Sequence, residues 1–373
     1  MNAKIQITRR YDIDWLRVIA VLLLIPFHTM HIFILQPYSI VYIKNVNAIR
    51  SFEVITGFMH EFHMPLLFLL AGASAYLSLQ FRSSSQFIGE RFKRLLLPLC
   101  FGILFLVPPM TYIYQISIGN KISLLEHYKN FFTSNPGDLS GITGAFTPAH
   151  LWFILFLFLF SFAGIPFFGV LSKHNNTWNK LHGLLTKRFL LILMAVPLAL
   201  LTAVNILGDK NPLVYFLIFL YGYLFMTDEE YQKAINRDKA GFLIAAVIIE
   251  IILQCYTNDL IEWSAGWLTY ELIRVVNRLL WVFVILGFGN QYLNKPSKVL
   301  SYLSGASFPV YILHFPINTV VGYSIVRLEV GSYLKFVLIM ILTTVLTLGL
   351  YEIIRHSKLI CLLLGMKNSH SAL

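Results

Sequence analysis

The sequence YDIDWLRVIAVLLLIPFHTMHIF, residues 11–33, decides the fold of this chain. From Trp15 to Leu35 the run holds one residue that is charged at neutral pH, Arg17. A helix needs about 20 predominantly apolar residues to cross the hydrocarbon core of a membrane. The stretch therefore predicts a membrane-spanning helix that carries an arginine and two histidines, His28 and His31, on a largely apolar surface.

The composition extends this interpretation to all 373 residues. Charged residues make up 13% and hydrophobic residues 57%, whereas a soluble domain carries about 25% charged residues. These values exclude a water-soluble enzyme, and the 15% of aromatic residues excludes a disordered chain. Ten apolar segments lie near residues 14–35, 53–79, 95–117, 149–171, 189–207, 213–226, 240–257, 267–289, 299–325 and 333–355. We predict an all-α, polytopic integral membrane protein in which residues 1–373 form one transmembrane domain, because the strand alternation of a membrane barrel is absent.

The basic residues predict the orientation of these spans. With the N-terminus in the cytoplasm, nineteen of the 29 Lys and Arg residues fall in inner segments and seven in outer segments. Cytoplasmic loops carry such an excess, so we expect ten spans with both termini inside. The excess also explains the net charge of +11, and no nucleic-acid partner is expected. No pattern indicates the oligomeric state.

Ionisable residues at membrane depth are expensive and suggest function. Arg17 and His28 are eleven residues apart, so they share one stripe of a helix, about 16 Å apart along its axis. Asp14 lies one turn from Arg17 and is expected to pair with it. The alternative is an interfacial arginine that snorkels and a histidine that packs against a neighbouring helix.

A second ionisable cluster lies in the span near 267–289. Glu271, Arg274 and Arg278 recur at spacings of three and four, which places them on one stripe with net positive charge. Such a stripe suits an anionic ligand or a developing oxyanion. A structural ion-pair network that locks helices together is the alternative.

Two further histidines, His63 and His314, lie in the spans near 53–79 and 299–325. Either is a candidate base or a packing residue. Together with His60, His63 forms an i,i+3 pair that could touch one ion, but there is no HExxH sequence. We therefore predict no metal site.

Four stretches together match a known family. They are DxxR followed by ten residues and His (Asp14, Arg17, His28), FHMPLLFLLAG (Phe62–Gly72), RFKRLLLP (Arg91–Pro98), and HLWFI (His150–Ile154) with FPVYILH (Phe308–His314). In this order the chain resembles the acyltransferase-3 family of integral membrane acyltransferases, which modify sugars of bacterial envelopes, glucans and some small molecules.

The likeness is greatest to the short members without a soluble SGNH hydrolase-like domain, including the glucan-modifying group. It implies that the membrane domain alone performs the transfer. The chain has Ala71-Gly72 where the family often has Ser-Gly, and we interpret this as a packing position.

We expect an O-acyltransferase that moves an acetyl or succinyl group from acyl-CoA to a hydroxyl of a carbohydrate, glycolipid or other cell-envelope acceptor. Acyl-CoA is then a donor substrate, and no permanently bound cofactor is expected. Near the inner face, four basic residues could hold the phosphates of the donor: Arg17, Arg91, Lys93 and Arg94. His28 is the expected general base, with His314 and His63 as rivals. Arg274 or Arg278 would steady the oxyanion, and direct transfer and a relay through an acylated histidine both stay open.

Two other functions remain open from the sequence alone. Intramembrane Glu, Arg and His residues also suit a proton-coupled transporter, although no internal repeat or pair of Gly/Pro-interrupted spans supports it. A structural or sensing membrane protein would leave the buried charges unexplained. Binding of coenzyme A separates the first two functions. The expected location is the bacterial inner membrane.

The topology gives the first prediction. A reporter that is active only outside the cytoplasm, fused after Leu373, should be silent, because the positive-inside count places the C-terminus in the cytoplasm. Reporter activity in intact cells measures this. A strong external signal would mean that one span is miscounted, most plainly the short sixth one near 213–226.

Overall fold

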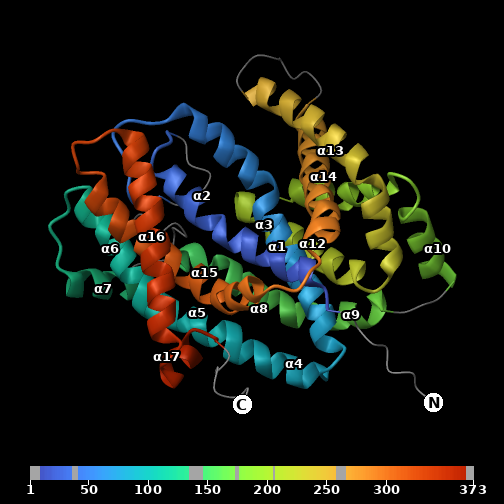
Figure 1. The fold of residues 1–373 in the computed structure, drawn as a ribbon, viewed down its shortest axis with the longest axis horizontal. Coiled ribbons are helices and arrows are strands. Elements are labelled where there is room, and N and C mark those ends of the chain that lie inside the picture. Colours follow the sequence, from blue (N-terminus) through green and yellow to red (C-terminus); the bar gives the residue numbers. More distant parts are fainter. Residues whose placement is uncertain are drawn as a thin grey trace. The chain divides into compact units, whose positions relative to one another are not determined.

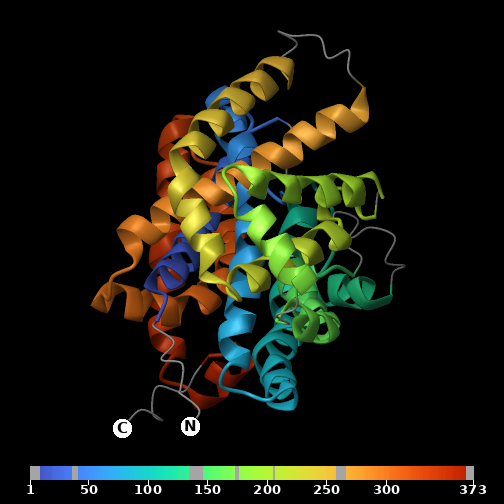
Figure 2. The ribbon, with the colours of Figure 1, turned by 90° about the vertical axis from the view of Figure 1, so that its right-hand side faces the viewer.

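The computed structural model describes residues 9–35, 41–133, 146–172, 176–204, 206–257 and 266–366. Every regular element in these ranges is helical, and no strand occurs among them (Figures 1 and 2). The prediction of an all-α chain is confirmed. The helices form two compact units, which we call the first unit (Met1–Ile19, Pro65–Ser74, Leu171–Ser304) and the second unit (Ala20–Met64, Ala75–Val170, Gly305–Leu373).

Seventeen α-helices and five shorter turns of helix follow one another along the described chain (Figure 1). The α-helices are α1 (Tyr11–Leu22), α2 (Leu24–His31), α3 (Arg50–Leu79), α4 (Ser84–Arg91), α5 (Leu97–Phe101), α6 (Val107–Ser117), α7 (Leu124–Thr133), α8 (Trp152–Ala163), α9 (Ile165–Leu171), α10 (Asn176–Leu185), α11 (Ala195–Ala203), α12 (Pro212–Phe225), α13 (Glu229–Thr257), α14 (Trp267–Leu293), α15 (Lys298–Ile325), α16 (Ser332–Ile354) and α17 (Lys358–Leu363). The shorter turns are the π-helical η1 (Phe92–Leu96) and η2 (Gly102–Leu106) and the 3-10 η3 (Ala149–Leu151), η4 (Leu190–Met194) and η5 (Gly208–Lys210).

Five helical stretches in the described ranges are long and apolar enough to cross a membrane: Tyr11–His31, Arg50–Leu79, Ser84–Ser117, Trp267–Leu293 and Ser332–Ile354. Two bent helix pairs, Ala149–Ala163 with Ile165–Leu171 and Asn179–Leu185 with Leu190–Ala203, raise the number to seven if each pair is one span. The chain is thus a multi-pass membrane protein. Each of the ten predicted segments lies on helix, but α12 has 14 residues, short of the roughly 20 that cross a bilayer. The count of ten and the orientation stay predictions.

Within the first unit, two glycines let α3 and α12 cross with their backbones in contact. A Cβ added at Gly72 would lie 1.9 Å from the carbonyl oxygen of Phe219, and one added at Gly222 would lie 1.8 Å from that of Leu69. Small residues at such crossings are typical of membrane helices, which associate by close packing rather than by the hydrophobic effect. The Ala71-Gly72 pair that we interpret as a packing position therefore includes the crossing point.

A closed ring of hydrogen bonds joins the start of α1 to α13 and α14 in the same unit. Arg10 binds Asp12 at 2.7 Å and the side-chain oxygen of Gln232 at 2.7 Å. Asn290 donates to Asp12 at 2.8 Å, Asn236 donates to Asn290 at 2.9 Å, and Gln232 donates to Asn236 at 3.0 Å. Since each member bonds two others, these polar groups are satisfied and hold the three segments in one register.

The glycine crossing gives a prediction about stability. Gly222→Ala should destabilise the protein, because the added methyl group cannot fit against the Leu69 carbonyl; overpacking of this kind costs about 1–3 kcal/mol. The matched control is Gly349→Ala on α16, where a Cβ meets nothing within 4 Å and alanine favours the helix by roughly 0.5–1 kcal/mol. Thermal unfolding in detergent, followed by size exclusion, should rank the control above the wild type and Gly222→Ala below it. Equal stability of the two variants would contradict the close crossing.

Candidate active site

Five buried histidines gather in the second unit, from four separate elements. His28 and His31 lie on α2, His63 on α3, His150 on η3 and His314 on α15. Each is at most 7% exposed. Histidine is seldom fully buried without a polar partner, so the cluster is the natural candidate for the site.

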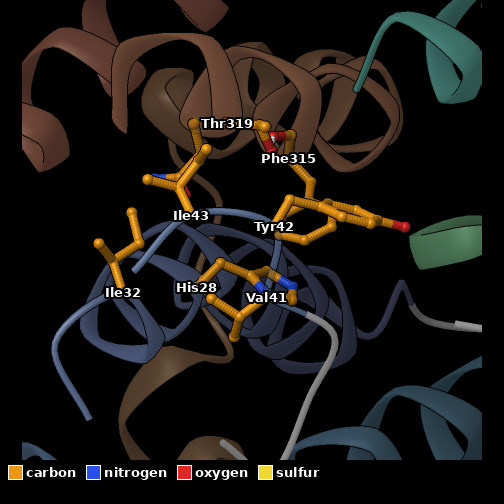
Figure 3. A pocket seen from close by; sticks show the side chains of 8 residues that line it. His28, Ile32, Val41, Tyr42, Ile43, Phe315 and Thr319 are labelled. Carbon is orange, nitrogen blue, oxygen red and sulfur yellow. Dashed lines mark hydrogen bonds between the residues drawn. The ribbon is translucent and has the colours of Figure 1, made fainter. Parts of the chain in front are cut away.

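His28 lines a cavity in the second unit. Its ring centroid lies 5.4 Å from that of His314 and 4.3 Å from that of Phe315. The cavity is small and partly open to solvent, with about 210 Å³ of space between the atoms that includes this open part. Its lining comes from α2, the segment 41–43 and α15 (Figure 3): His28, Ile32, Val41, Tyr42, Ile43, Phe315, Asn318 and Thr319.

The helices that carry His28 and His314 are fixed to each other by a buried amide. Asn318, one turn beyond His314 on α15, donates to the hydroxyl of Thr29 at 2.7 Å and to that of Thr343 at 3.4 Å. Thr29 is the neighbour of His28 on α2, and Thr343 lies on α16. These bonds tie three helices together directly beside the two histidines.

Backbone carbonyls fix which nitrogen carries the proton in two of the histidines. The Nδ1 of His314 lies 2.8 Å from the carbonyl oxygen of Tyr311 and 3.0 Å from that of Val310. Because a carbonyl only accepts, Nδ1 of the neutral ring is the N–H donor and Nε2 keeps a lone pair. In the same way, the Nε2 of His150 donates to the carbonyl of Ile312 at 3.0 Å, which leaves a lone pair on Nδ1.

Pro316 explains why the Ile312 carbonyl is available to His150. In an α-helix this carbonyl would accept from the backbone N–H four residues later, but proline has none. Pro316 lies inside α15, so the freed acceptor turns to another element. The proline in the sequence FPVYILHFP thus creates the bond that sets the tautomer of His150.

Three nitrogens of this cluster are buried and have no hydrogen-bond partner among the described residues: His28 Nδ1, His150 Nδ1 and His314 Nε2. A buried polar atom without a partner costs about 1–3 kcal/mol. The three lie on adjacent rings, since His150 and His314 are 5.9 Å apart at their centroids. At His150 and His314 the nitrogen without a partner carries a lone pair, which can take up a proton.

His150 is the residue that sequence reasoning did not assign to the site. It was part of the HLWFI stretch, and the rule that selected His314, an ionisable side chain at the end of an apolar run, would have selected it too. The structure holds its turn tightly: Ala149 has φ of +46°, unusual for a residue other than glycine, and its N–H donates to Thr147 at 3.0 Å. The hydroxyl of Tyr311 donates to the backbone carbonyl of His150.

His63 and His31 lie beside the cavity histidine without lining the cavity. The Nε2 of His63 donates to the carbonyl of Ala20 at 2.6 Å, close to the break between α1 and α2. The Nδ1 of His31 donates to the carbonyl of Phe27 at 2.7 Å. Both rings contact Phe27, at 5.8 Å for His63 and 4.3 Å for His31. The assignment of His28, His314 or His63 as the base stays a prediction.

Arg17 belongs to the first unit and is held by two polar groups. Its guanidinium lies 2.6 Å from the Asp14 carboxylate and donates to the Ser74 hydroxyl at 3.3 Å. The predicted pairing with Asp14 is confirmed. The same carboxylate binds Arg9 at 3.0 Å, so two arginines share one negative charge and the group keeps a net positive charge.

The RFKR stretch belongs to the second unit and lies where α4 passes into η1. Arg94 binds Glu90 at 3.1 Å, the Arg91 guanidinium lies 4.4 Å from the Phe87 ring centroid, and Lys93 is exposed. The π-helical turn Phe92–Leu96 falls here because Pro98 cannot bond the Arg94 carbonyl, and such turns often mark functional sites. The structure leaves binding of phosphates by Arg91, Lys93 and Arg94 as a prediction.

The arginines of α14 belong to a polar network of the first unit. Arg274 binds Glu271 at 3.1 Å, as the spacing of three predicts. Asn277, between Arg274 and Arg278, donates to Glu250 of α13 at 2.7 Å. This bond joins α13 and α14, which run side by side in Figure 2. Such a network favours the interpretation as a lock between helices, and the oxyanion role of Arg274 or Arg278 stays a prediction.

No group of three or more His, Cys, Asp or Glu residues within the described ranges could hold a metal ion.

Comparison with known proteins agrees with the resemblance seen in the sequence. The model of a family described as an acyltransferase domain, acyltransferase-3, matches residues 10–352. The chain belongs to the acyltransferase-3 family. Similar relatives are the glucans biosynthesis protein C of three Escherichia coli strains, SMS-3-5, O139:H28 E24377A and O157:H7 EC4115. Each is 22% identical to this chain, and the match covers 92% of this chain and 91% of the relative. No solved structure matches.

Membership of the acyltransferase-3 family makes this chain a membrane-embedded O-acyltransferase. The helical fold with several apolar helices agrees with that class.

Proposed function

We propose that this protein moves an acetyl or succinyl group from acyl-CoA to a hydroxyl of a glucan or another cell-envelope carbohydrate, in the bacterial inner membrane. The observation that carries the proposal is the position of His28, which lines the cavity and has a buried nitrogen without a partner beside His314 and His150. Family membership supports the class of reaction. The printed name of the relatives, glucans biosynthesis, supports a glucan as the acceptor.

The donor is proposed to enter from the cytoplasmic side. Coenzyme A carries phosphates, and arginine holds phosphate through two parallel hydrogen bonds. Arg17, in the positively charged group with Arg9 and Asp14, is one candidate contact. Arg91, Lys93 and Arg94 are the others, and the exposed Lys93 is the most accessible of these three.

The reaction follows the chemistry of a thioester and an alcohol. The hydroxyl gives its proton to His28 while its oxygen bonds to the carbonyl carbon of the thioester. The tetrahedral intermediate carries an oxyanion on the former thioester carbonyl oxygen. When the carbon–sulfur bond breaks, the thiolate takes up a proton, and the products are one ester and one coenzyme A thiol.

A relay through an acylated histidine gives the same products in two steps. The two routes differ when the acceptor is absent. A relay would release about one coenzyme A per protein in a burst, whereas direct transfer would release none above hydrolysis. The position of His28 in the wall of the cavity is compatible with both routes.

The base gives the next prediction. His28→Ala should lower the rate of acyl transfer by about 10²–10⁴-fold, or about 3–5 kcal/mol of barrier, while the protein still inserts and binds donor. His31→Ala is the matched control on the same helix; it should cost much less, because His31 does not line the cavity. The acylated glucan is measured by mass, and membrane expression by blot. Loss of product in His314→Ala with near-normal product in His28→Ala would move the base to α15.

The donor contact gives a prediction about binding. Arg17→Ala should weaken binding of coenzyme A to the purified protein, and Arg17→Lys should lose part of it, because lysine cannot hold a phosphate in a bidentate fork. The control is Lys233→Ala, an exposed residue of the same unit that pairs with the exposed Glu230 at 2.7 Å. Calorimetry or ligand-induced thermal shift measures the affinity.

Two outcomes would count against this account. Unchanged binding in Arg17→Ala would make Arg17 a snorkelling anchor. No binding of coenzyme A by the wild-type protein would contradict acyl-CoA as the donor.

A further inference from the structure

In the second unit, two arginines share one carboxylate where α3 passes into α4 (Figure 1). One carboxylate oxygen of Glu90 lies 3.2 Å from Nε of Arg82, and the other lies 3.1 Å from Nε of Arg94. The contact of Glu90 with Arg94 follows from their spacing of four on a helix. Arg82 precedes α4 and reaches the same carboxylate from the turn after α3. The fold therefore brings Arg82 to Arg94, and the spacing along the sequence does not predict it.

The turn that carries Arg82 is held at several points. The Nη1 of Arg82 donates to the hydroxyl of Ser78, on the last turn of α3, at 2.8 Å. Ser83 caps α4: its hydroxyl accepts from the Gln86 N–H at 3.3 Å, and its N–H donates to the Gln86 side chain at 3.0 Å. Phe87 anchors α4 by complete burial. These contacts fix α4, and with it the placement of the two guanidinium groups around Glu90.

The two arginines have more charge and more donors than Glu90 engages. Two positive charges against one negative charge leave a formal charge of +1. A guanidinium has five N–H donors. The contacts above engage Nε and Nη1 of Arg82 and Nε of Arg94, so N–H groups of both remain for a ligand. The side chains are 38% and 35% exposed, and exposed ion pairs contribute little to stability. The arrangement suits the binding of an anion.

The position of the cluster along its span agrees with a cytoplasmic ligand. The helical stretch Ser84–Ser117 has 34 residues, more than the roughly 20 that cross the hydrocarbon core. Its polar beginning, which contains Glu90 and Arg94, therefore extends past the hydrocarbon. The excess of basic residues predicts that this end is cytoplasmic. Acyl-CoA, the donor of the proposed reaction, is a cytoplasmic anion.

Coenzyme A carries two kinds of phosphate, a pyrophosphate and a 3′-phosphate monoester on the ribose. A monoester has three terminal oxygens and a charge of about −1.5 to −2 at pH 7. Each phosphorus of the pyrophosphate, like that of a phospholipid diester, has two such oxygens and one negative charge. Arginine binds phosphate through two parallel hydrogen bonds. Three terminal oxygens can receive two arginines at once, so the pair fits the monoester best.

Resting on the proposed function, we propose that Arg82 and Arg94, bridged by Glu90, bind the 3′-phosphate of the acyl-CoA donor. The proposal adds a binding residue that lies outside the RFKR stretch, and it names the part of the donor that this residue recognises. Because Glu90 already holds both guanidinium groups, less side-chain freedom is lost when the phosphate binds.

The test compares coenzyme A with dephospho-coenzyme A, which lacks only the 3′-phosphate. The full chain is purified into phosphatidylcholine nanodiscs, and both affinities are measured by calorimetry. We expect the wild type to bind coenzyme A about 10–100-fold more tightly, as hydrogen bonds to a charged group contribute. Arg82→Gln should lose most of this preference and leave the affinity for dephospho-coenzyme A unchanged.

Two further variants complete the test. Arg355→Gln is the matched control: Arg355 is 39% exposed, pairs with Glu352 at 3.2 Å, and lies on the same predicted side of the membrane. It removes the same charge and should change neither affinity. Arg82→Lys keeps the charge but cannot form the bidentate fork, so it should lose part of the preference. Thermal unfolding verifies the fold, and Arg82→Lys carries the test if Arg82→Gln does not fold.

The other outcomes overturn the proposal. Equal affinity of the wild type for the two nucleotides contradicts recognition of the 3′-phosphate, and so does an equal loss of both affinities in Arg82→Gln. Unchanged affinity for coenzyme A in Arg82→Gln makes Arg82 a surface ion pair and leaves the proposed donor standing. If that variant instead loses stabilisation by phosphatidylglycerol in the nanodiscs, the arginines bind lipid phosphate. If the wild type does not bind coenzyme A at all, the proposed donor fails and this inference fails with it.

Discussion

The structure depends on one constraint: inside a membrane there is no water to satisfy a polar group. Each buried N–H, carbonyl, carboxylate and ring nitrogen must find its partner within the protein or stay unpaired at a cost. Most of the polar groups described here are paired. The ring formed by Arg10, Asp12, Asn290, Asn236 and Gln232 bonds each member to two others, and Asn277 and Gln254 both donate to Glu250.

Against this background the histidine cluster stands apart. His28, His150 and His314 each keep one nitrogen buried without a partner in the described structure. The same backbone that satisfies the other nitrogen also decides which lone pair remains. In α15 the sequence determines which ring nitrogens are bonded. Tyr311 and His314 share a face at a spacing of three, and Pro316 frees the Ile312 carbonyl. The fold thus produces proton acceptors of defined orientation from carbonyls that any helix contains.

Much of the fold followed from local patterns. Segments of about 20 apolar residues predicted helices, and spacings of three predicted the pairs Asp14–Arg17 and Glu271–Arg274, since i,i+3 residues are neighbours on any helix. Contacts between residues on different helices could not be predicted from spacing along the sequence. Nothing in a single sequence places His150 beside His314, or Gly222 against the Leu69 carbonyl, because register between helices is set by packing. The number of membrane spans could not be predicted from hydropathy alone. The helix α12 is as apolar as a membrane span, but it has only 14 residues.

The central claim is that this chain transfers an acyl group from a thioester to a carbohydrate hydroxyl by itself. The most direct measurement uses the purified protein in lipid nanodiscs with acetyl-CoA or succinyl-CoA and a defined linear glucan. The free thiol of coenzyme A is measured with a colorimetric thiol reagent, and the acylated glucan is measured by mass spectrometry. The account predicts that thiol appears only when glucan is present above the hydrolysis background, in a one-to-one ratio with new ester. Thiol without ester, or neither product with a folded protein, would contradict it.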